Sequence, residues 1–170
     1  MRRQSFTLGV KMATEIEHKF LLKNENWRKE VSHCVVYKQG YLSSQSTSSI
    51  RVRISNREAW LNIKSATIGT QRSEYEYEIP LSDAQEILDN LCFKPVIEKT
   101  RHFVKYENHL WEIDEFDGEN AGLIVAEIEL NSLNENFTKP DWIGEDVTQD
   151  VRYYNNNLAK TPYSQWRNDA

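Results

Sequence analysis

Pairs of like-charged side chains, separated by a single residue, recur along this sequence and strongly constrain its fold. A β-strand sends successive side chains to opposite faces, so both members of each pair would lie on one face of a strand. Like charges this close repel each other, and the repulsion must be offset across the sheet or by a ligand. The pairs, in chain order, are Glu15/Glu17, Arg51/Arg53, Glu74/Glu76, Lys99/Arg101, Glu112/Asp114 and Glu127/Glu129.

Two arrangements could accommodate these charged faces. An ordinary antiparallel sheet would expose them to water, but such a face normally mixes Thr, Ser, Gln and Lys, whereas these segments carry purely acidic or purely basic pairs. A sheet closed into a barrel would gather the charges inside and place the apolar faces outside, under helices and loops, which reverses the usual barrel interior. A charged lumen must hold water or ions, because an unpaired buried charge is too costly. The recurrence of the pairs favours the barrel.

The remaining pattern predicts a mainly β protein of the α+β class. Eight segments have the composition of strands, and short polar turns separate several of them. A helix is predicted after Ser82, which would act as its N-cap with Gln85 three residues later, because apolar side chains follow at helical spacing. Residues 24–31 and 155–160 are candidate short helices. The strand candidates span residues 15–22, 34–42, 49–55, 59–65, 72–80, 96–106, 110–116 and 122–131. These elements predict an antiparallel, barrel-like domain.

The composition excludes several classes of protein. The chain has 170 residues, and its 21 basic and 26 acidic side chains give a net charge of −5, which argues against general nucleic-acid binding or a basic membrane-surface helix. The apolar stretches are too short to span a bilayer. Cys34 and Cys92 lack the spacing of a zinc site or disulfide scaffold and fit a reducing cytoplasm. We expect residues 1–13 to be a disordered extension, residues 14–160 a single domain and residues 161–170 a tail.

The combination of acidic and basic pairs indicates the chemistry of the lumen. Arg and Lys bind phosphate oxygens, and Arg can do so with two hydrogen bonds. Paired carboxylates bind Mg²⁺ or Mn²⁺, which prefer oxygen ligands and often bridge to phosphates. The sequence has no glycine-rich phosphate-binding loop, so side chains would have to hold the phosphates. The pairs therefore predict a site for a metal and a polyphosphate.

One further motif links the sequence to a known family. Glu15-Ile16-Glu17-His18-Lys19 matches the ExExK signature of the CYTH domain, or triphosphate tunnel metalloenzyme, superfamily. Other family elements follow in the family order, namely Gln39-Gly40-Tyr41-Leu42, Arg51-x-Arg53, Leu61-Asn62-Ile63-Lys64, Arg72-x-Glu74-x-Glu76, Glu98-Lys99-Thr100-Arg101, Trp111-Glu112-Ile113-Asp114, Glu127-x-Glu129 and Asp146-Val147-Thr148 with Arg152-Tyr153. Residues 14–158 resemble the short bacterial members of this family, which are similar to inorganic triphosphatases.

The resemblance implies a fold and a set of roles. The family fold is an eight-stranded antiparallel β-barrel that forms a tunnel with inward charges, and its members act on triphosphates with Mg²⁺ or Mn²⁺. By position, the implied metal ligands are Glu15, Glu17, Glu127 and Glu129. The implied phosphate-binding residues are Lys19, Arg51, Arg53, Lys64, Lys99, Arg101 and Arg152. The implied catalytic residues on the acidic side are Glu74, Glu76 and Asp114. Relatives often read Asp-Lys-Arg-Tyr where this chain has Val151 before Arg152, so one basic position is absent.

Three other side chains can be assigned to the inside, the outside or the rim of the expected lumen. His18 falls on the opposite face of its strand from Glu17, and we expect a packed or exposed histidine rather than a catalytic base. Tyr41 is a candidate lumen residue. Glu78 shares the face of Glu74 and Glu76 but lies further along the strand, and we expect it at the rim.

These observations predict a metal-dependent hydrolase that releases phosphate and pyrophosphate from inorganic triphosphate. Alternatives within the superfamily are an adenylate cyclase and a thiamine, nucleoside or RNA 5′-triphosphatase. A non-catalytic polyphosphate-binding module is a different class, which would need the basic pairs but not the carboxylates. We expect a cytoplasmic protein with a small-molecule partner and no membrane or nucleic-acid partner, and the sequence leaves open whether it forms a homodimer.

Overall fold

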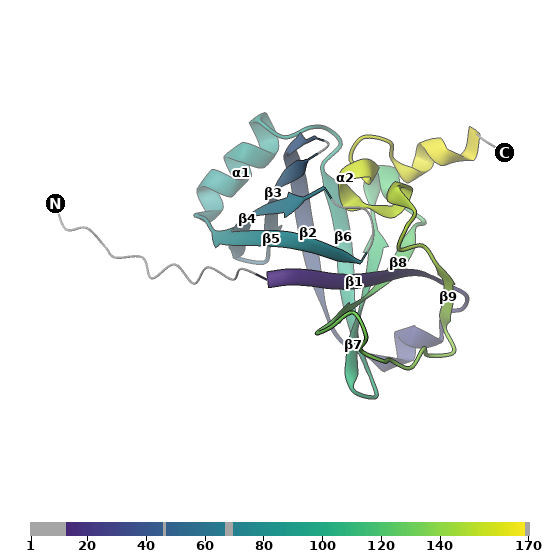
Figure 1. Ribbon diagram of the computed structural model, residues 1–170. Helices are drawn as coiled ribbons and strands as arrows, with labels where there is room; N and C mark the ends of the chain where they lie inside the picture. The colour runs from purple at the N-terminus through teal and green to yellow at the C-terminus, as the bar shows by residue number, and fades with distance from the viewer. Residues whose placement is uncertain (1–12, 46, 67–69, 169–170) are drawn as a thin grey trace.

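Eight antiparallel strands close into a barrel in the computed structural model, which describes residues 13–45, 47–66 and 70–168. The strands are β1 (Ala13–Leu22), β2 (Val31–Ser44), β3 (Ser48–Ser55), β4 (Glu58–Ser65), β5 (Gln71–Glu78), β6 (Ile97–Tyr106), β7 (His109–Phe116) and β8 (Ile124–Leu130). They follow the order β5-β4-β3-β2-β6-β7-β8-β1, and pairing of β1 with β5 closes the ring (Figure 1). The predicted eight-stranded barrel is confirmed. A ninth strand, β9 (Ile143–Asp146), was not predicted and extends the sheet beside β1.

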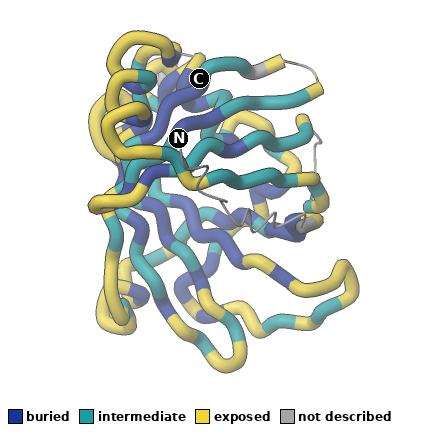
Figure 2. Tube along the Cα trace, turned by 90° about the vertical axis from the view of Figure 1, so that its left-hand side faces the viewer, coloured by how far each residue is buried: buried dark blue, intermediate teal, exposed yellow. Residues whose placement is uncertain are grey.

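The apolar side chains of the strands face outward, as the charge alternation predicts. On β3, Val52 packs outward against Ala84 and Leu88 of helix α1 (Leu81–Asn90), while the flanking arginines face the interior. A larger cluster covers the outside of β1, β6, β7 and β8 beneath the 3-10 helix η1 (Asn26–Glu30) and β9. Its largest buried side chains are Phe20, Trp27, Trp111 and Trp142. Most of the core therefore lies around the barrel rather than inside it, and exposed residues gather in the connecting loops (Figure 2).

One end of the barrel interior is apolar. Tyr41, Ile97 and Phe116 pack there against Leu158 and its neighbour Ala159. Leu158 ends helix α2 (Asn155–Leu158), which lies against this end of the barrel (Figure 1). The charged part of the lumen thus has an apolar floor.

Gly40 marks the closest approach between the barrel wall and the segment that ends α1. A Cβ atom at this position would lie 2.8 Å from Cys92 Cβ and 2.9 Å from Leu88 Cδ2. Because both neighbours belong to the packed cluster under α1, Gly40→Ala is expected to lower the free energy of unfolding by about 1–3 kcal/mol. Urea denaturation measures this loss. Gly118→Ala has open space around the new Cβ but a positive φ of 60°, so the two variants separate overpacking from backbone strain.

The helices differ in detail from the prediction. The Ala84 N–H donates to the Pro80 carbonyl, so α1 begins at Leu81 and Ser82 is not the N-cap as predicted. The Ser82 hydroxyl donates instead to Asp83. The candidate helix over residues 24–31 is the 3-10 helix η1, and the candidate over residues 155–160 contains α2. Short 3-10 helices also occur at η2 (Gly118–Asn120), η3 (Val151–Tyr153) and η4 (Tyr163–Asn168).

The expected chain boundaries are only partly within the described residues. Residues 1–12 of the expected extension lie outside them, whereas Ala13 already pairs with Glu74 in the barrel. In the expected tail, Tyr163 and Trp166 pack against the apolar floor. Cys34 and Cys92 are free thiols. Within the described ranges, no helix combines the length and the apolar character needed to cross a membrane.

Candidate active site

A cavity of about 600 Å³ occupies the charged part of the barrel interior. Its walls come from all eight barrel strands, with the segment around α2 completing them. The structure brings eleven of the predicted site residues to this cavity, namely Glu15, Glu17, Lys19, Arg51, Arg53, Lys64, Glu74, Glu76, Arg101, Glu127 and Glu129. Tyr41, a candidate lumen residue, also lines it. Charged side chains from separate strands therefore line the same cavity.

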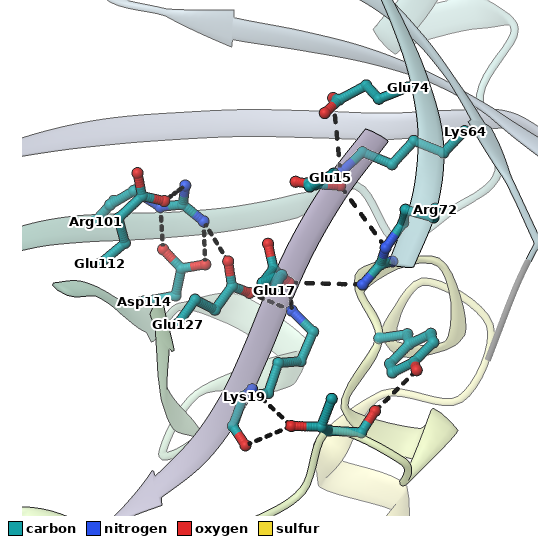
Figure 3. Close-up of polar contacts among 12 residues, drawn as sticks. Glu15, Glu17, Lys19, Lys64, Arg72, Glu74, Arg101, Glu112, Asp114 and Glu127 are labelled. Carbon is teal, nitrogen blue, oxygen red and sulfur yellow. Dashed lines mark hydrogen bonds and ion pairs between the residues drawn. The ribbon is translucent and has the colours of Figure 1, made fainter. Parts of the chain in front are cut away.

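A chain of ion pairs connects the carboxylates of β1 to its neighbours (Figure 3). Lys64 Nζ donates to Glu15 Oε2 at 3.0 Å. Lys19 Nζ lies 2.7 Å from Glu17 Oε1 and also donates to Glu127. Burial alone lowers the pKa of Lys19, but Glu127 and Glu17 raise it above its ordinary value. The acidic side is therefore neutralised by cations of the chain itself.

A second network lies deeper, around Arg101. Its guanidinium donates to both oxygens of Asp114, from Nε at 2.7 Å and from Nη2 at 2.8 Å, and reaches Glu127 and Glu112 as well. Lys99 Nζ lies 2.5 Å from Asp114 Oδ2. Burial opposes the charged carboxylate of Asp114, but Arg101 and Lys99 hold its pKa below the ordinary value. Burial lowers the pKa of Lys99 to about 8. Lys99 and Asp114 are fully buried and do not line the cavity, but Asp114 holds Arg101, which does.

The opposite wall carries Arg51 and Arg53 on β3. Arg53 lies 3.4 Å from Glu76, and Arg51 lies 3.9 Å from Glu74. Burial, followed by the charges of Arg51 and Arg101, lowers the pKa of Arg53 to about 10. Among the residues that the structure describes, the buried Nε atoms of Arg51 and Arg53 have no hydrogen-bond partner. Crowded cations with unused donors are suited to binding an anion with many oxygens.

The carboxylates of β1 and β8 have the donor chemistry of a divalent-metal site. Glu17 and Glu129 are direct partners across the β1–β8 pair, and Glu15 and Glu127 face the same cavity. Carboxylate oxygens are the ligands that hard divalent cations prefer. Within the described ranges, no three acidic, His or Cys side chains form a ready-made metal cluster. These carboxylates are suitable metal ligands, but a metal could bind them only after their ion pairs with Lys19, Lys64 and the neighbouring cations break.

Comparison with known proteins supports this interpretation of the barrel. The CYTH domain family model matches residues 13–163. The chain belongs to the CYTH domain family. An inorganic triphosphatase of Acetivibrio thermocellus is 49% identical over 156 residues, covering 92% of this chain and 99% of the relative. An inorganic triphosphatase of Nitrosomonas europaea is 36% identical over 150 residues, covering 86% and 97%. The crystal structure of an inorganic triphosphatase matches with a TM-score of 0.64 and 34% identity, covering 87% of this chain and 95% of that one.

Membership of this family of tunnel metalloenzymes implies dependence on a divalent metal. Arg152 was expected to contact phosphate. Arg152 does not line the cavity: its side chain is 63% exposed and lies 2.6 Å from Asp150. The 3-10 turn η3 brings Val151 to the cavity instead. The residue of this turn that lines the cavity is therefore apolar rather than basic.

Several cavity residues were not selected from the sequence. Arg72 and Glu112 line the cavity. Glu112 belongs to one of the like-charged pairs but was given no role, whereas Arg72 shares the parity of Glu74 and Glu76, so the alternation could have found it. Tyr154 and Lys160 come from the segment around α2, where no strand alternation exists to indicate a face. Lys160 adds a cation to the cavity that Val151 also lines.

His18 and Glu78 lie away from the cavity wall, as expected. His18 packs on the outside of β1, with ring centroids 5.6 Å from Phe137 and 6.3 Å from Phe20. Glu78 is exposed at the end of β5 and does not line the cavity.

Proposed function

We propose that this chain is a metal-dependent hydrolase of inorganic triphosphate that releases pyrophosphate and phosphate. The observation that carries the proposal is the single cavity in which a basic wall faces a row of carboxylates. A short, highly charged anion fits that wall, and the carboxylates suit a divalent cation that shares its charge. The 49% identity to a relative named inorganic triphosphatase, over nearly all of both chains, supports the same substrate class.

Arg51, Arg53 and Lys64 would bind the triphosphate oxygens. Their side chains project from neighbouring strands of a closed barrel, so the cations already line one wall of the cavity before the substrate arrives. Negative charge grows on the bridging oxygen as its bond to the terminal phosphorus breaks, and fixed cations stabilise that charge without reorganising. Removing one such donor commonly lowers the rate by about 10²–10³.

Glu15, Glu17, Glu127 and Glu129 would hold the metal, for which we propose Mg²⁺ or Mn²⁺. When bound, it would neutralise phosphate oxygens and lower the pKa of a coordinated water. Glu74 and Glu76 would position the attacking water. Water oxygen bonds to the terminal phosphorus, the bridging P–O bond breaks, pyrophosphate leaves, and a carboxylate takes the water proton. Asn62 donates to both carboxylates, at 3.1 Å and 2.6 Å, and fixes their direction.

Lys99 and Asp114 would act as positioning residues. Asp114 holds the Arg101 guanidinium through two hydrogen bonds, so the remaining donors of Arg101 point toward Glu112 and Glu127. This arrangement supports a role for Asp114 in fixing the position of Arg101 at the cavity rather than in contacting water. We further propose that the protein acts in the cytoplasm on a small-molecule substrate.

A phosphate-release panel tests the proposed function. Triphosphate, ATP, thiamine triphosphate and long-chain polyphosphate are each compared with Mg²⁺, Mn²⁺ and Ca²⁺, while cyclic AMP is monitored. We expect triphosphate to be the preferred substrate, and EDTA to abolish its hydrolysis. Preference for ATP with cyclic AMP formation would replace the proposal by a cyclase. Tight triphosphate binding without phosphate release would replace it by a non-catalytic binding module.

A further inference from the structure

Arg72 lies between two carboxylates that we assign to the metal. It sits on β5 directly opposite Glu15 of β1. Its Nε is 3.7 Å from Glu15 Oε2, and its Nη2 is 3.6 Å from Glu17 Oε1 (Figure 3). Burial lowers the pKa of Arg72, but Glu17 and Glu15 outweigh this and raise it above the ordinary value. The two carboxylates therefore share one guanidinium, in addition to their separate ion pairs with Lys64 and Lys19.

The contacts of Arg72 with these carboxylates are loose. Both distances exceed the 2.7–2.9 Å of a charge-assisted hydrogen bond, and within the described part of the chain the buried Nε has no hydrogen-bond partner. The bidentate grip of Arg101 on Asp114, at 2.7 and 2.8 Å, is the contrasting case in the same barrel. An ion pair held by charge alone can be exchanged for another cation without breaking a hydrogen bond.

The C-terminal segment keeps the guanidinium at the cavity. The Arg72 Cζ lies 5.2 Å from the ring centroid of Tyr154, within the range of a cation–π contact. The Tyr154 hydroxyl donates to the Thr148 carbonyl at 2.9 Å, and Thr148 Oγ1 accepts from the Lys19 N–H at 3.0 Å. The ring is thereby tied to β1, so Arg72 retains one partner if it leaves the carboxylates.

We propose that Arg72 is an exchangeable counter-ion, which a divalent cation displaces from Glu15 and Glu17 and which then binds the triphosphate in the same cavity. The second half of this inference rests on the proposed function, and the first half does not. Because the guanidinium and the metal compete for the same oxygens, each weakens the binding of the other by the same factor. Removing the guanidinium must then strengthen metal binding and weaken triphosphate binding.

Mn²⁺ binding without substrate tests the exchange. Free Mn²⁺ is titrated by electron paramagnetic resonance against wild-type protein and the variants Arg72→Gln, Arg72→Lys and Arg53→Gln. We expect Arg72→Gln to bind Mn²⁺ about tenfold more tightly. Arg72→Lys keeps the charge in a compact ammonium and is expected to fall between Arg72→Gln and the wild type. Arg53→Gln removes the same charge from the same cavity but from a partner of Glu76, so its Mn²⁺ affinity is expected to change by less than about twofold.

Two results would overturn the exchange. One is an unchanged or weaker Mn²⁺ affinity in Arg72→Gln, measured on protein whose circular dichroism matches the wild type. The other is equal strengthening in Arg53→Gln, which would indicate a general effect of cavity charge. Should Arg72→Gln fail to fold, Arg72→Lys decides alone, because an affinity equal to that of the wild type contradicts the exchange.

A second measurement tests the fate of the displaced guanidinium. At saturating Mn²⁺, the half-saturating triphosphate concentration of Arg72→Gln is expected to rise about tenfold. An unchanged value would overturn phosphate binding by Arg72 while leaving the exchange intact. If wild-type protein hydrolyses no triphosphate, the proposed function fails, yet the Mn²⁺ titration still decides the exchange.

Discussion

Asp114→Ala is expected to lower the free energy of unfolding by about 3–5 kcal/mol. Asp114 is fully buried and is the shared partner of Lys99 and Arg101, both of which are also buried. Its removal leaves the buried Lys99 ammonium without its 2.5 Å partner. Urea denaturation followed by tryptophan fluorescence measures the loss.

Asp89→Ala provides the matched control, because Asp89 is an exposed residue of α1 that accepts from Gln85. The same chemical change there is expected to alter the free energy of unfolding by less than about 0.5 kcal/mol. Asp114→Asn keeps the shape but not the charge and is expected to destabilise nearly as much as alanine. A loss below about 1 kcal/mol in Asp114→Ala would contradict the view that this carboxylate is needed to stabilise the buried cations Lys99 and Arg101.

Strand alternation predicted the architecture because it depends only on local geometry. A residue that shares the parity of Glu17 must share its face, whatever the rest of the chain does. The apolar side chains of the opposite parity, such as Val52, then require cover, which α1 provides. Sign and parity favoured a barrel with an inverted interior over a solvated sheet, and the family resemblance then implied that fold.

Alternation could not predict depth. Lys99 and Arg101 share a face of β6, yet only Arg101 reaches the cavity, because strands are tilted and staggered around a closed barrel. The depth of each residue depends on the register with both neighbouring strands, which one strand does not encode. The lining residues of the segment around α2 were harder to predict. Whether Val151 or Arg152 lines the cavity depends on the 3-10 turn η3, which strand alternation does not describe.

Glu129→Ala is expected to reduce metal-dependent triphosphate turnover by about 10²–10³ while leaving the fold intact. Glu129 is exposed, lines the cavity and lies directly across from Glu17, so it can contribute an oxygen to a cation held by β1 and β8. The substitution removes little buried surface, and the melting temperature is expected to stay near that of the wild type. The half-saturating Mn²⁺ concentration is expected to rise, because one of four proposed carboxylates is lost.

Glu78→Ala separates this effect from a general change in charge. Glu78 is also exposed and follows Glu74 and Glu76 on the same face of β5, but it lies outside the cavity. Both variants add one unit to the net charge, so they alter the long-range field of the protein to a similar extent. Glu78 does not line the cavity, so its loss is expected to leave the Mn²⁺ dependence unchanged, whereas the loss of a metal ligand is expected to alter it. Wild-type turnover by Glu129→Ala at equal Mn²⁺, or an equal loss in Glu78→Ala, would therefore remove Glu129 from the metal site and leave Glu15, Glu17 and Glu127 to hold the cation.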